Sequence, residues 1–172
     1  MTVDWVPFVA LEGLAMVFGW ETLRSRQWTW QQRGALAAGL FYLMVVIVLC
    51  FRPTGPETDR SYISINQVPF NLIPLQNFHI DFFENILMTV PAGGFMAIFF
   101  RRFRSRTIVG LAVLPGLTIE LCQLVSDFCC GLYRVVDIDD VITNWLGVLI
   151  GFALTEMVIA ILPRHLNRLA LA

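Results

Sequence analysis

Hydrophobic residues occur in five long runs separated by polar connections. The runs are Trp5–Leu23, Gly34–Phe51, Phe82–Phe100, Thr107–Val125 and Val141–Leu162. Each approaches the roughly 20 apolar residues that a helix needs to cross a bilayer core of about 30 Å. The first run is the shortest, and Glu12 interrupts it. The pattern predicts an all-α, polytopic membrane protein built as a five-helix transmembrane bundle.

Arginines alternate between the connections and predict the orientation of the helices. Most of them follow the first, third and fifth runs: Arg24, Arg26, Arg33, Arg101, Arg102, Arg104, Arg106, Arg164 and Arg168. The other connections hold Arg52, Arg60 and Arg134. Because basic residues in short loops stay in the cytoplasm, we expect a multi-pass protein of the plasma (inner) membrane. Its N-terminus lies outside, and residues 163–172 form a cytoplasmic tail.

Composition strengthens this interpretation. The 172 residues are 57% hydrophobic and 15% charged, whereas soluble domains have about 45–50% apolar and about 25% charged residues. A net charge of −1 argues against a nucleic-acid partner, because such proteins usually carry a basic surface. Cys50, Cys129 and Cys130 fall near the outer face, where disulfides form. Their spacing selects no pairing, and free thiols remain an alternative.

The first outward-facing connection, Arg52–Asp81, is long. Its prolines, Pro53, Pro56, Pro69 and Pro74, exclude one continuous helix. The second half mixes apolar residues with amides, which suits the membrane interface or a re-entrant turn buried in protein. His79, two residues before Asp81, is a weak acid/base candidate. The other outward connection is Ser126–Asp140.

Polar residues inside the predicted helices recur at helical spacing. Glu120 and Gln123 lie three apart on one face of the fourth helix, in its outer half. Asp137, Asp140 and Asn144 are spaced three and four apart, so they share a face if the fifth helix begins at or before Asp137. In the third helix, Asn85 and Thr89 lie four apart at the outer end. Gly147 and Gly151 form a small-xxx-small pair, which favours close helix packing.

These polar residues reach the same leaflet, beside Arg134, and predict an acid-rich pocket that opens outward. The candidate ligand-binding residues are Asn85, Glu120, Gln123, Arg134, Asp137, Asp139, Asp140 and Asn144. Glu120, Asp137 and Asp140 are also the candidates for catalysis and for binding a divalent cation. Two structural alternatives remain open. Asp139 is a candidate helix cap. Glu120 and Gln123 are candidates for hydrogen bonds between helices.

Several motifs resemble those of a known family. They are Asn71-Leu72-Ile73-Pro74-Leu75, Glu84-Asn85-Ile86-Leu87 with Pro91-Ala92-Gly93, Ile119-Glu120-Leu121-Cys122-Gln123, and the stretch from Arg134 to Gly147 that contains Asp137-Ile138-Asp139-Asp140 and Asn144. In this order, residues 61–155 resemble a VanZ-like domain, whose namesake is linked to resistance to the glycopeptide antibiotic teicoplanin. Residues 1–60 resemble the family only in being hydrophobic and form two N-terminal transmembrane helices. The Cys129-Cys130 pair departs from the family pattern.

Three functions fit this arrangement. The first is an envelope factor whose pocket binds a membrane lipid, a lipid-linked envelope precursor or a lipoglycopeptide antibiotic. The second is an intramembrane enzyme that acts on a lipid-linked phosphate or glycosyl group, with Arg134 on a phosphate. The third is a small transporter in which Glu12 and Glu120 form a relay. The chain has no inverted repeat, although a homo-oligomer would supply a second half. The sequence favours the first and leaves catalysis open.

Overall fold

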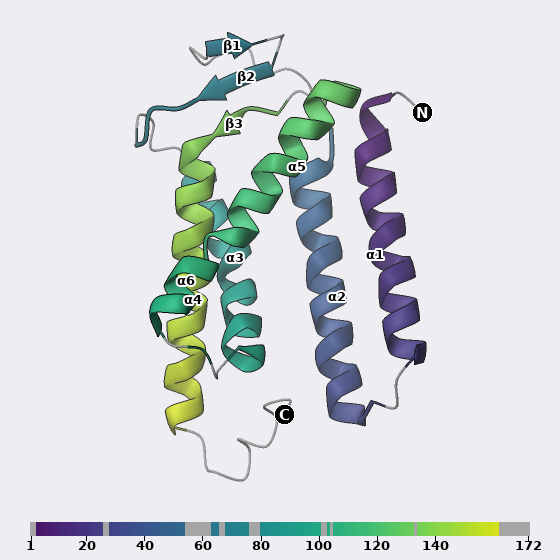
Figure 1. Ribbon diagram of the computed structural model, residues 1–172, viewed down its shortest axis with the longest axis vertical. Coiled ribbons are helices and arrows are strands. Elements are labelled where there is room, and N and C mark those ends of the chain that lie inside the picture. Colours follow the sequence, from purple (N-terminus) through teal and green to yellow (C-terminus); the bar gives the residue numbers. More distant parts are fainter. Residues whose placement is uncertain are drawn as a thin grey trace. The chain divides into compact units, whose positions relative to one another are not determined.

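The computed structural model describes residues 3–25, 28–53, 63–65, 68–75, 80–100, 103, 105–132 and 134–161. Figure 1 shows their elements in chain order: η1 (Val3–Trp5), α1 (Val6–Ser25), α2 (Trp30–Phe51), β1 (Ile63–Ile65), β2 (Val68–Asn71), α3 (Ile80–Phe99), α4 (Ser105–Leu111), α5 (Leu114–Cys130), β3 (Val136–Asp137) and α6 (Ile138–Ile161). The predicted cytoplasmic tail and His79 lie outside the described residues.

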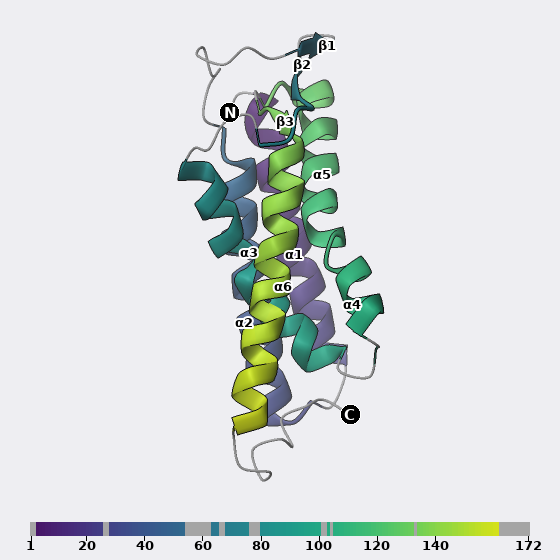
Figure 2. The same ribbon diagram turned by 90° about the vertical axis from the view of Figure 1, so that its left-hand side faces the viewer.

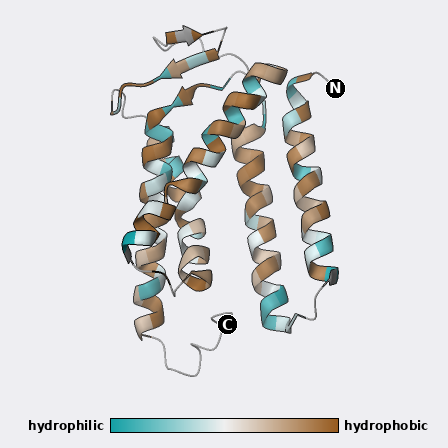
Figure 3. Ribbon diagram, viewed as in Figure 1, coloured by the Kyte–Doolittle hydropathy of each residue, from teal (hydrophilic) through white to brown (hydrophobic). Residues whose placement is uncertain are grey.

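Five segments are long and apolar enough to cross a membrane, and each coincides with a predicted run. They are Val3–Arg24, Trp30–Phe51, Ile80–Phe99, Arg106–Cys130 and Ile138–Ile161. Figure 3 shows hydrophobic residues along most of α2 and hydrophilic residues at its N-terminal end. The prediction of an all-α, multi-pass membrane protein is confirmed.

A capping box sets the start of α2 before the predicted Gly34. The Thr29 hydroxyl accepts a hydrogen bond from the backbone N–H of Gln32 at 3.3 Å. In return, the Gln32 side-chain oxygen accepts from the backbone N–H of Thr29 at 3.0 Å. Because this pair satisfies two donors that a helix N-terminus leaves unpaired, the helix begins at Trp30.

The fourth span is interrupted between α4 and α5. Pro115 lies in the first turn of α5 and has no N–H to donate to the carbonyl of Leu111. The regular backbone hydrogen bonds of a helix resume where the N–H of Leu117 donates to the carbonyl of Val113 at 3.0 Å. The Trp145 indole of α6 donates to the carbonyl of Val109 at 3.0 Å, which ties α4 to α6. The proline therefore divides one predicted span into two helices.

The chain forms two compact units. The first comprises Met1–Asn71 and Leu121–Val136, and the second comprises Leu72–Glu120 and Asp137–Ala172. Helix α5 begins in the second unit and continues into the first.

In the first unit α1 packs along α2 (Figure 1). A Cβ added to Gly19 would collide with the Leu40 side chain of α2. Ala15, four residues before Gly19, is also buried. Small residues on this side of α1 therefore let the two helices approach closely.

A small β-sheet occupies part of the long connection that was expected to be an interfacial or re-entrant loop. Strands β1 and β2 pair antiparallel, with Ile63 opposite Phe70 and Ile65 opposite Val68. Strand β3 completes the sheet in the order β1-β2-β3. The sequence did not predict these strands, because they are two to four residues long and Pro69 lies within β2.

In the second unit α3 packs against α6, and Figure 2 shows it passing behind α6. A Cβ added to Gly147 would collide with the Ile86 carbonyl, and one added to Gly151 would collide with the Val90 carbonyl. On α3, a Cβ added to Gly93 would collide with the Val148 carbonyl. The predicted small-xxx-small contact is therefore confirmed, and its partner is α3.

Leu75 adopts an unusual backbone conformation in the turn before α3. Its φ is 59°, in the left-handed region that favours glycine, and its side chain is exposed. We expect Leu75→Gly to raise the free energy of unfolding by about 0.5–1 kcal/mol, because the left-handed conformation costs a non-glycine residue about 1–2 kcal/mol and glycine adds some entropy to the unfolded chain. The control Leu72→Gly, at an ordinary φ, should lower it. Thermal unfolding in detergent checks both, and equal losses in the two variants would contradict the prediction.

Candidate functional site

The start of α6 is fixed by Asp137, which caps the helix. Its side-chain Oδ1 accepts a hydrogen bond from the backbone N–H of Asp139 at 2.8 Å. The backbone N–H of Asp137 in turn donates to Oε2 of Glu120 on α5 at 3.2 Å. The prediction that Asp139 caps the helix is wrong, because a cap lies just before the first helical residue and Asp139 is already the second.

Asp139 instead holds the turn that precedes α3. The residue is buried, and its Oδ1 accepts a hydrogen bond from the backbone N–H of Leu75 at 2.7 Å. Hydrogen bonds to a charged acceptor are stronger than neutral ones. This contact therefore offsets part of the backbone strain at Leu75 and fixes the Leu72–Leu75 turn to the beginning of α6.

Asp140 joins α6 to α3. The side-chain Nδ2 of Asn85 donates to Oδ1 of Asp140 at 2.6 Å. One turn further, the Thr89 hydroxyl donates to the backbone carbonyl of Asn144 at 2.9 Å. Polar groups on neighbouring helices of the second unit thus bond to one another at the N-terminal end of α6.

Asn144 is the most deeply buried of the candidate residues, with 1% of its surface exposed. Its Cβ lies against α5, 2.8 Å from the position that a Cβ on Gly116 would take. Its side-chain Oδ1 is buried and has no hydrogen-bond partner among the residues that the structure describes. A buried amide oxygen without a donor costs about 1–3 kcal/mol.

Gln123 and Arg134 make their hydrogen bonds in the first unit. Gln123 Nε2 donates to the carbonyl of Cys50 at 2.9 Å, and Arg134 Nη2 donates to the carbonyl of Leu49 at 2.9 Å. Both carbonyls belong to the last turn of α2, where helix geometry leaves them without intrahelical partners. A cation at this end is also favoured by the helix dipole. Gln123 and Arg134 therefore pair carbonyls in the last turn of α2.

Asp127 is a buried polar residue that the sequence reasoning missed. Its Oδ1 accepts a hydrogen bond from the backbone N–H of Arg134 at 3.2 Å. Its spacing offered a signal, because Glu120, Gln123 and Asp127 are three and four residues apart on one helix. Asp127 positions the chain segment that carries Arg134.

The carboxylates do not form a recognisable metal centre. Within the described ranges, no group of three or more His, Cys, Asp or Glu is arranged to hold a metal ion. Binding of a divalent cation by Glu120, Asp137 and Asp140 stays a prediction. No disulfide joins any two of Cys50, Cys122, Cys129 and Cys130, all of which lie in the described part of the chain; Cys50 is buried and Cys129 is exposed.

The sequence as a whole was compared with models of protein families. A family model described as VanZ/LLP1 matches residues 39–160. The chain belongs to the VanZ/LLP1 family. No curated protein and no solved structure matches it.

The VanZ/LLP1 match is longer than the resemblance seen in residues 61–155. It begins within α2 and ends one residue before the end of α6. All eight candidate ligand-binding residues, from Asn85 to Asn144, lie inside it. Glu12 lies outside it. The C-terminal part of α2, whose carbonyls accept from Gln123 and Arg134, is therefore part of the VanZ/LLP1 domain.

Proposed function

We propose that this VanZ/LLP1 protein is an envelope factor that binds an amphipathic or lipid-linked ligand. The binding groups are the side chains of Glu120, Asp140 and Asn144 in the second unit, which we call the acceptor cluster. The observation that carries the proposal is Asn144 Oδ1, a buried amide oxygen without a donor in the described part of the chain. Such an atom stabilises a ligand that supplies an N–H or O–H group.

The chemistry of the acceptor cluster selects the polar part of the ligand. Carboxylates of Glu120 and Asp140 accept hydrogen bonds and repel anions. Arg134, the candidate phosphate-binding residue, belongs to the first unit and donates from Nη2 to the Leu49 carbonyl. A head rich in hydroxyl or amino groups therefore suits the cluster better than a phosphate. Sugar and amino groups of this kind occur in lipid-linked wall precursors and in lipoglycopeptide antibiotics.

The neighbouring turn suits the apolar part of the ligand. Leu72, Ile73 and Leu75 are each more than half exposed, and Asp139 ties this turn to α6. Exposed apolar side chains beside a polar cluster match a molecule that has an acyl chain and a polar head. The same residues suit the bilayer interface if this end of α6 lies outside the cytoplasm, as the arginine distribution predicts.

The family resemblance suggests a cellular consequence, which is protection against teicoplanin. We expect a susceptible bacterium that expresses the protein to tolerate more teicoplanin, and Glu120→Gln to remove most of that protection. Glutamine keeps an oxygen that accepts from the Asp137 N–H but removes the charge, so the fold should persist. The matched control is Glu84→Gln, an exposed glutamate next to Asn85. The measurement is the minimal inhibitory concentration at equal membrane levels of each variant.

Two outcomes decide between this proposal and its alternatives. Equal protection by wild type and Glu120→Gln would contradict a role for the acceptor cluster. Conversion of a lipid-linked wall precursor by the purified protein would replace the binding function with an enzymatic one. The proposal expects the precursor to be recovered unchanged.

A further inference from the structure

Glu12 is a buried carboxyl in the first unit, inside a helix that is otherwise apolar around it. It is the seventh residue of α1 (Val6–Ser25), and only 9% of its surface is exposed. Its Oε2 is buried and has no hydrogen-bond partner in the portion of the chain that the structure describes. An ionisable group at membrane depth costs about 2.5–3.5 kcal/mol on insertion scales and usually marks a functional position.

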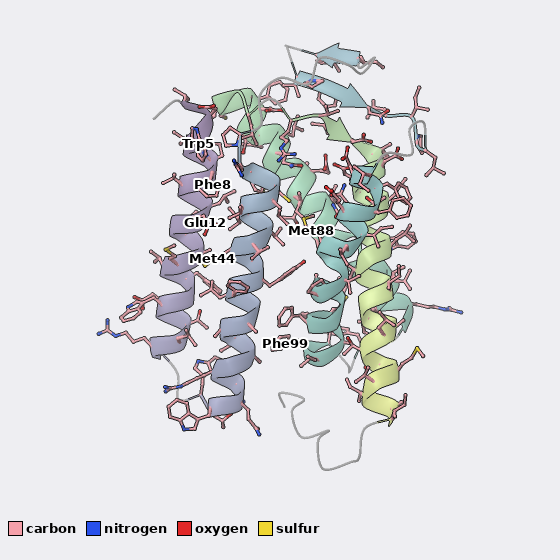
Figure 4. The ribbon with its side chains drawn as sticks, turned by 180° about the vertical axis from the view of Figure 1, so that it is seen from behind. Trp5, Phe8, Glu12, Met44, Met88 and Phe99 are labelled. Carbon is pink, nitrogen blue, oxygen red and sulfur yellow. The ribbon has the colours of Figure 1, made fainter. Side chains whose placement is uncertain are left out.

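Glu12 lies on the side of α1 that packs against α2. It is three residues before Ala15 and seven before Gly19, so the three share one helix face. Ala15 is buried, and Gly19 lies against Leu40 of α2. Figure 4 shows Glu12 near Met44 of α2. The carboxyl is therefore held at the contact between two helices of the first unit.

Two aromatic residues precede Glu12. Phe8 lies four residues before it in α1 and Trp5 seven residues before it in η1, and both lie above Glu12 in Figure 4. The rings of Trp5 and Phe8 meet edge to face, with centroids 5.8 Å apart and an angle of 85° between their planes. Aromatic faces attract cations, most strongly when water is excluded. A buried carboxyl and a pair of aromatic rings near the same end of the first unit offer the chemistry that attracts positive charge.

A second acidic residue lies at the end of this face. Asp4 belongs to η1, and its Oδ1 is also buried without a hydrogen-bond partner within the described ranges. Eight residues separate Asp4 from Glu12, which is about 12 Å along a helix axis. One small ion cannot contact both carboxyls, so we assign Asp4 to attracting the cation at the end of α1 and Glu12 to binding it.

We propose that Trp5, Phe8 and Glu12 bind a lipophilic organic cation. The Glu12 carboxylate pairs with the positive charge, and the rings of Trp5 and Phe8 pack against the groups that carry it. The apolar body of the ligand extends over the exposed side chain of Val9, three residues before Glu12 on α1. A hydrated metal ion fits less well, because the neighbouring rings and aliphatic groups offer no oxygen ligands.

This site is independent of the acceptor cluster. It belongs to the first unit, whereas Glu120, Asp140 and Asn144 belong to the second. It also lies outside residues 39–160, the part of the chain that matches the VanZ/LLP1 family. Failure of one proposal therefore leaves the other standing.

The test uses tetraphenylphosphonium, a lipophilic cation without hydrogen-bond donors. Equilibrium dialysis of the purified full-length protein in detergent should show saturable binding. Glu12→Gln should weaken it about tenfold or more, as expected for loss of a charge contact in a dry site. Trp5→Leu should weaken it about three- to tenfold through loss of the ring. The matched controls are Glu21→Gln and Trp20→Leu, exposed residues of α1, and both should bind like wild type.

The outcomes are decisive in either direction. Absence of saturable binding by the wild-type protein, or equal affinity in wild type and Glu12→Gln, overturns the proposal. Equal weakening by Glu12→Gln and Glu21→Gln also overturns it, because binding would then follow net charge. If Glu12→Gln does not elute as a folded protein, Trp5→Leu and its Trp20→Leu control decide the question.

Discussion

Gly151→Ala is expected to lower the free energy of unfolding by about 3 kcal/mol, near the upper end of what overpacking usually costs. A Cβ at this position collides with the carbonyl oxygen of Val90 and lies 2.8 Å from the Val90 carbonyl carbon. These are backbone atoms of α3, so no side chain can rotate away and the two helices must separate. The hydrogen bonds between α3 and α6, from Asn85 to Asp140 and from Thr89 to the Asn144 carbonyl, would weaken as the helices separate.

The matched control is Gly110→Ala in α4, where a Cβ meets nothing within 4 Å. That substitution should be neutral or stabilise the protein by about 0.5–1 kcal/mol, because alanine is the better helix former. Thermal unfolding in detergent, followed by circular dichroism, measures both variants. Similar midpoints for the two would contradict the close approach of α3 and α6.

Asn85→Ala is expected to destabilise the protein by about 1.5–3 kcal/mol, because it removes a hydrogen bond to a charged acceptor. The lost contact joins Asn85 Nδ2 to Asp140 Oδ1 at 2.6 Å. A double-mutant cycle with Asp140→Ala isolates the pairwise energy. We expect a coupling of about 1–2 kcal/mol between two residues in direct contact. Additive losses would show that the two side chains do not interact in the membrane-embedded protein.

The membrane spans were predictable because the bilayer sets one length for every helix that crosses it. Hydropathy alone located all five. Local interactions set where the helices begin and end. The Thr29–Gln32 capping box starts α2 before the predicted Gly34, and Pro115 divides the fourth span. The strands of the β-sheet were not predictable, because runs of two to four residues are too short to show an alternating pattern.

The acceptor residues were predictable from helical spacing, which placed Asp140 and Asn144 on one face of α6. Their partners were only partly predictable. Spacing along one helix does not tell which helix end lies beside it, so the contacts of Gln123 and Arg134 with α2 could not be foreseen. For the same reason the hydrogen bond from the Leu75 N–H to Asp139 could not be predicted from the sequence, since 64 residues separate the two.

Direct binding to the acceptor cluster tests the central claim most sharply. Purified protein in lipid nanodiscs is titrated with teicoplanin and, separately, with a lipid-linked wall precursor, and the dissociation constant is measured for wild type, Glu120→Gln and Glu84→Gln. The account predicts saturable binding of at least one of the two, weakened about tenfold by Glu120→Gln and unchanged by Glu84→Gln. The same dissociation constant in all three proteins, or saturable binding of neither compound, would contradict it.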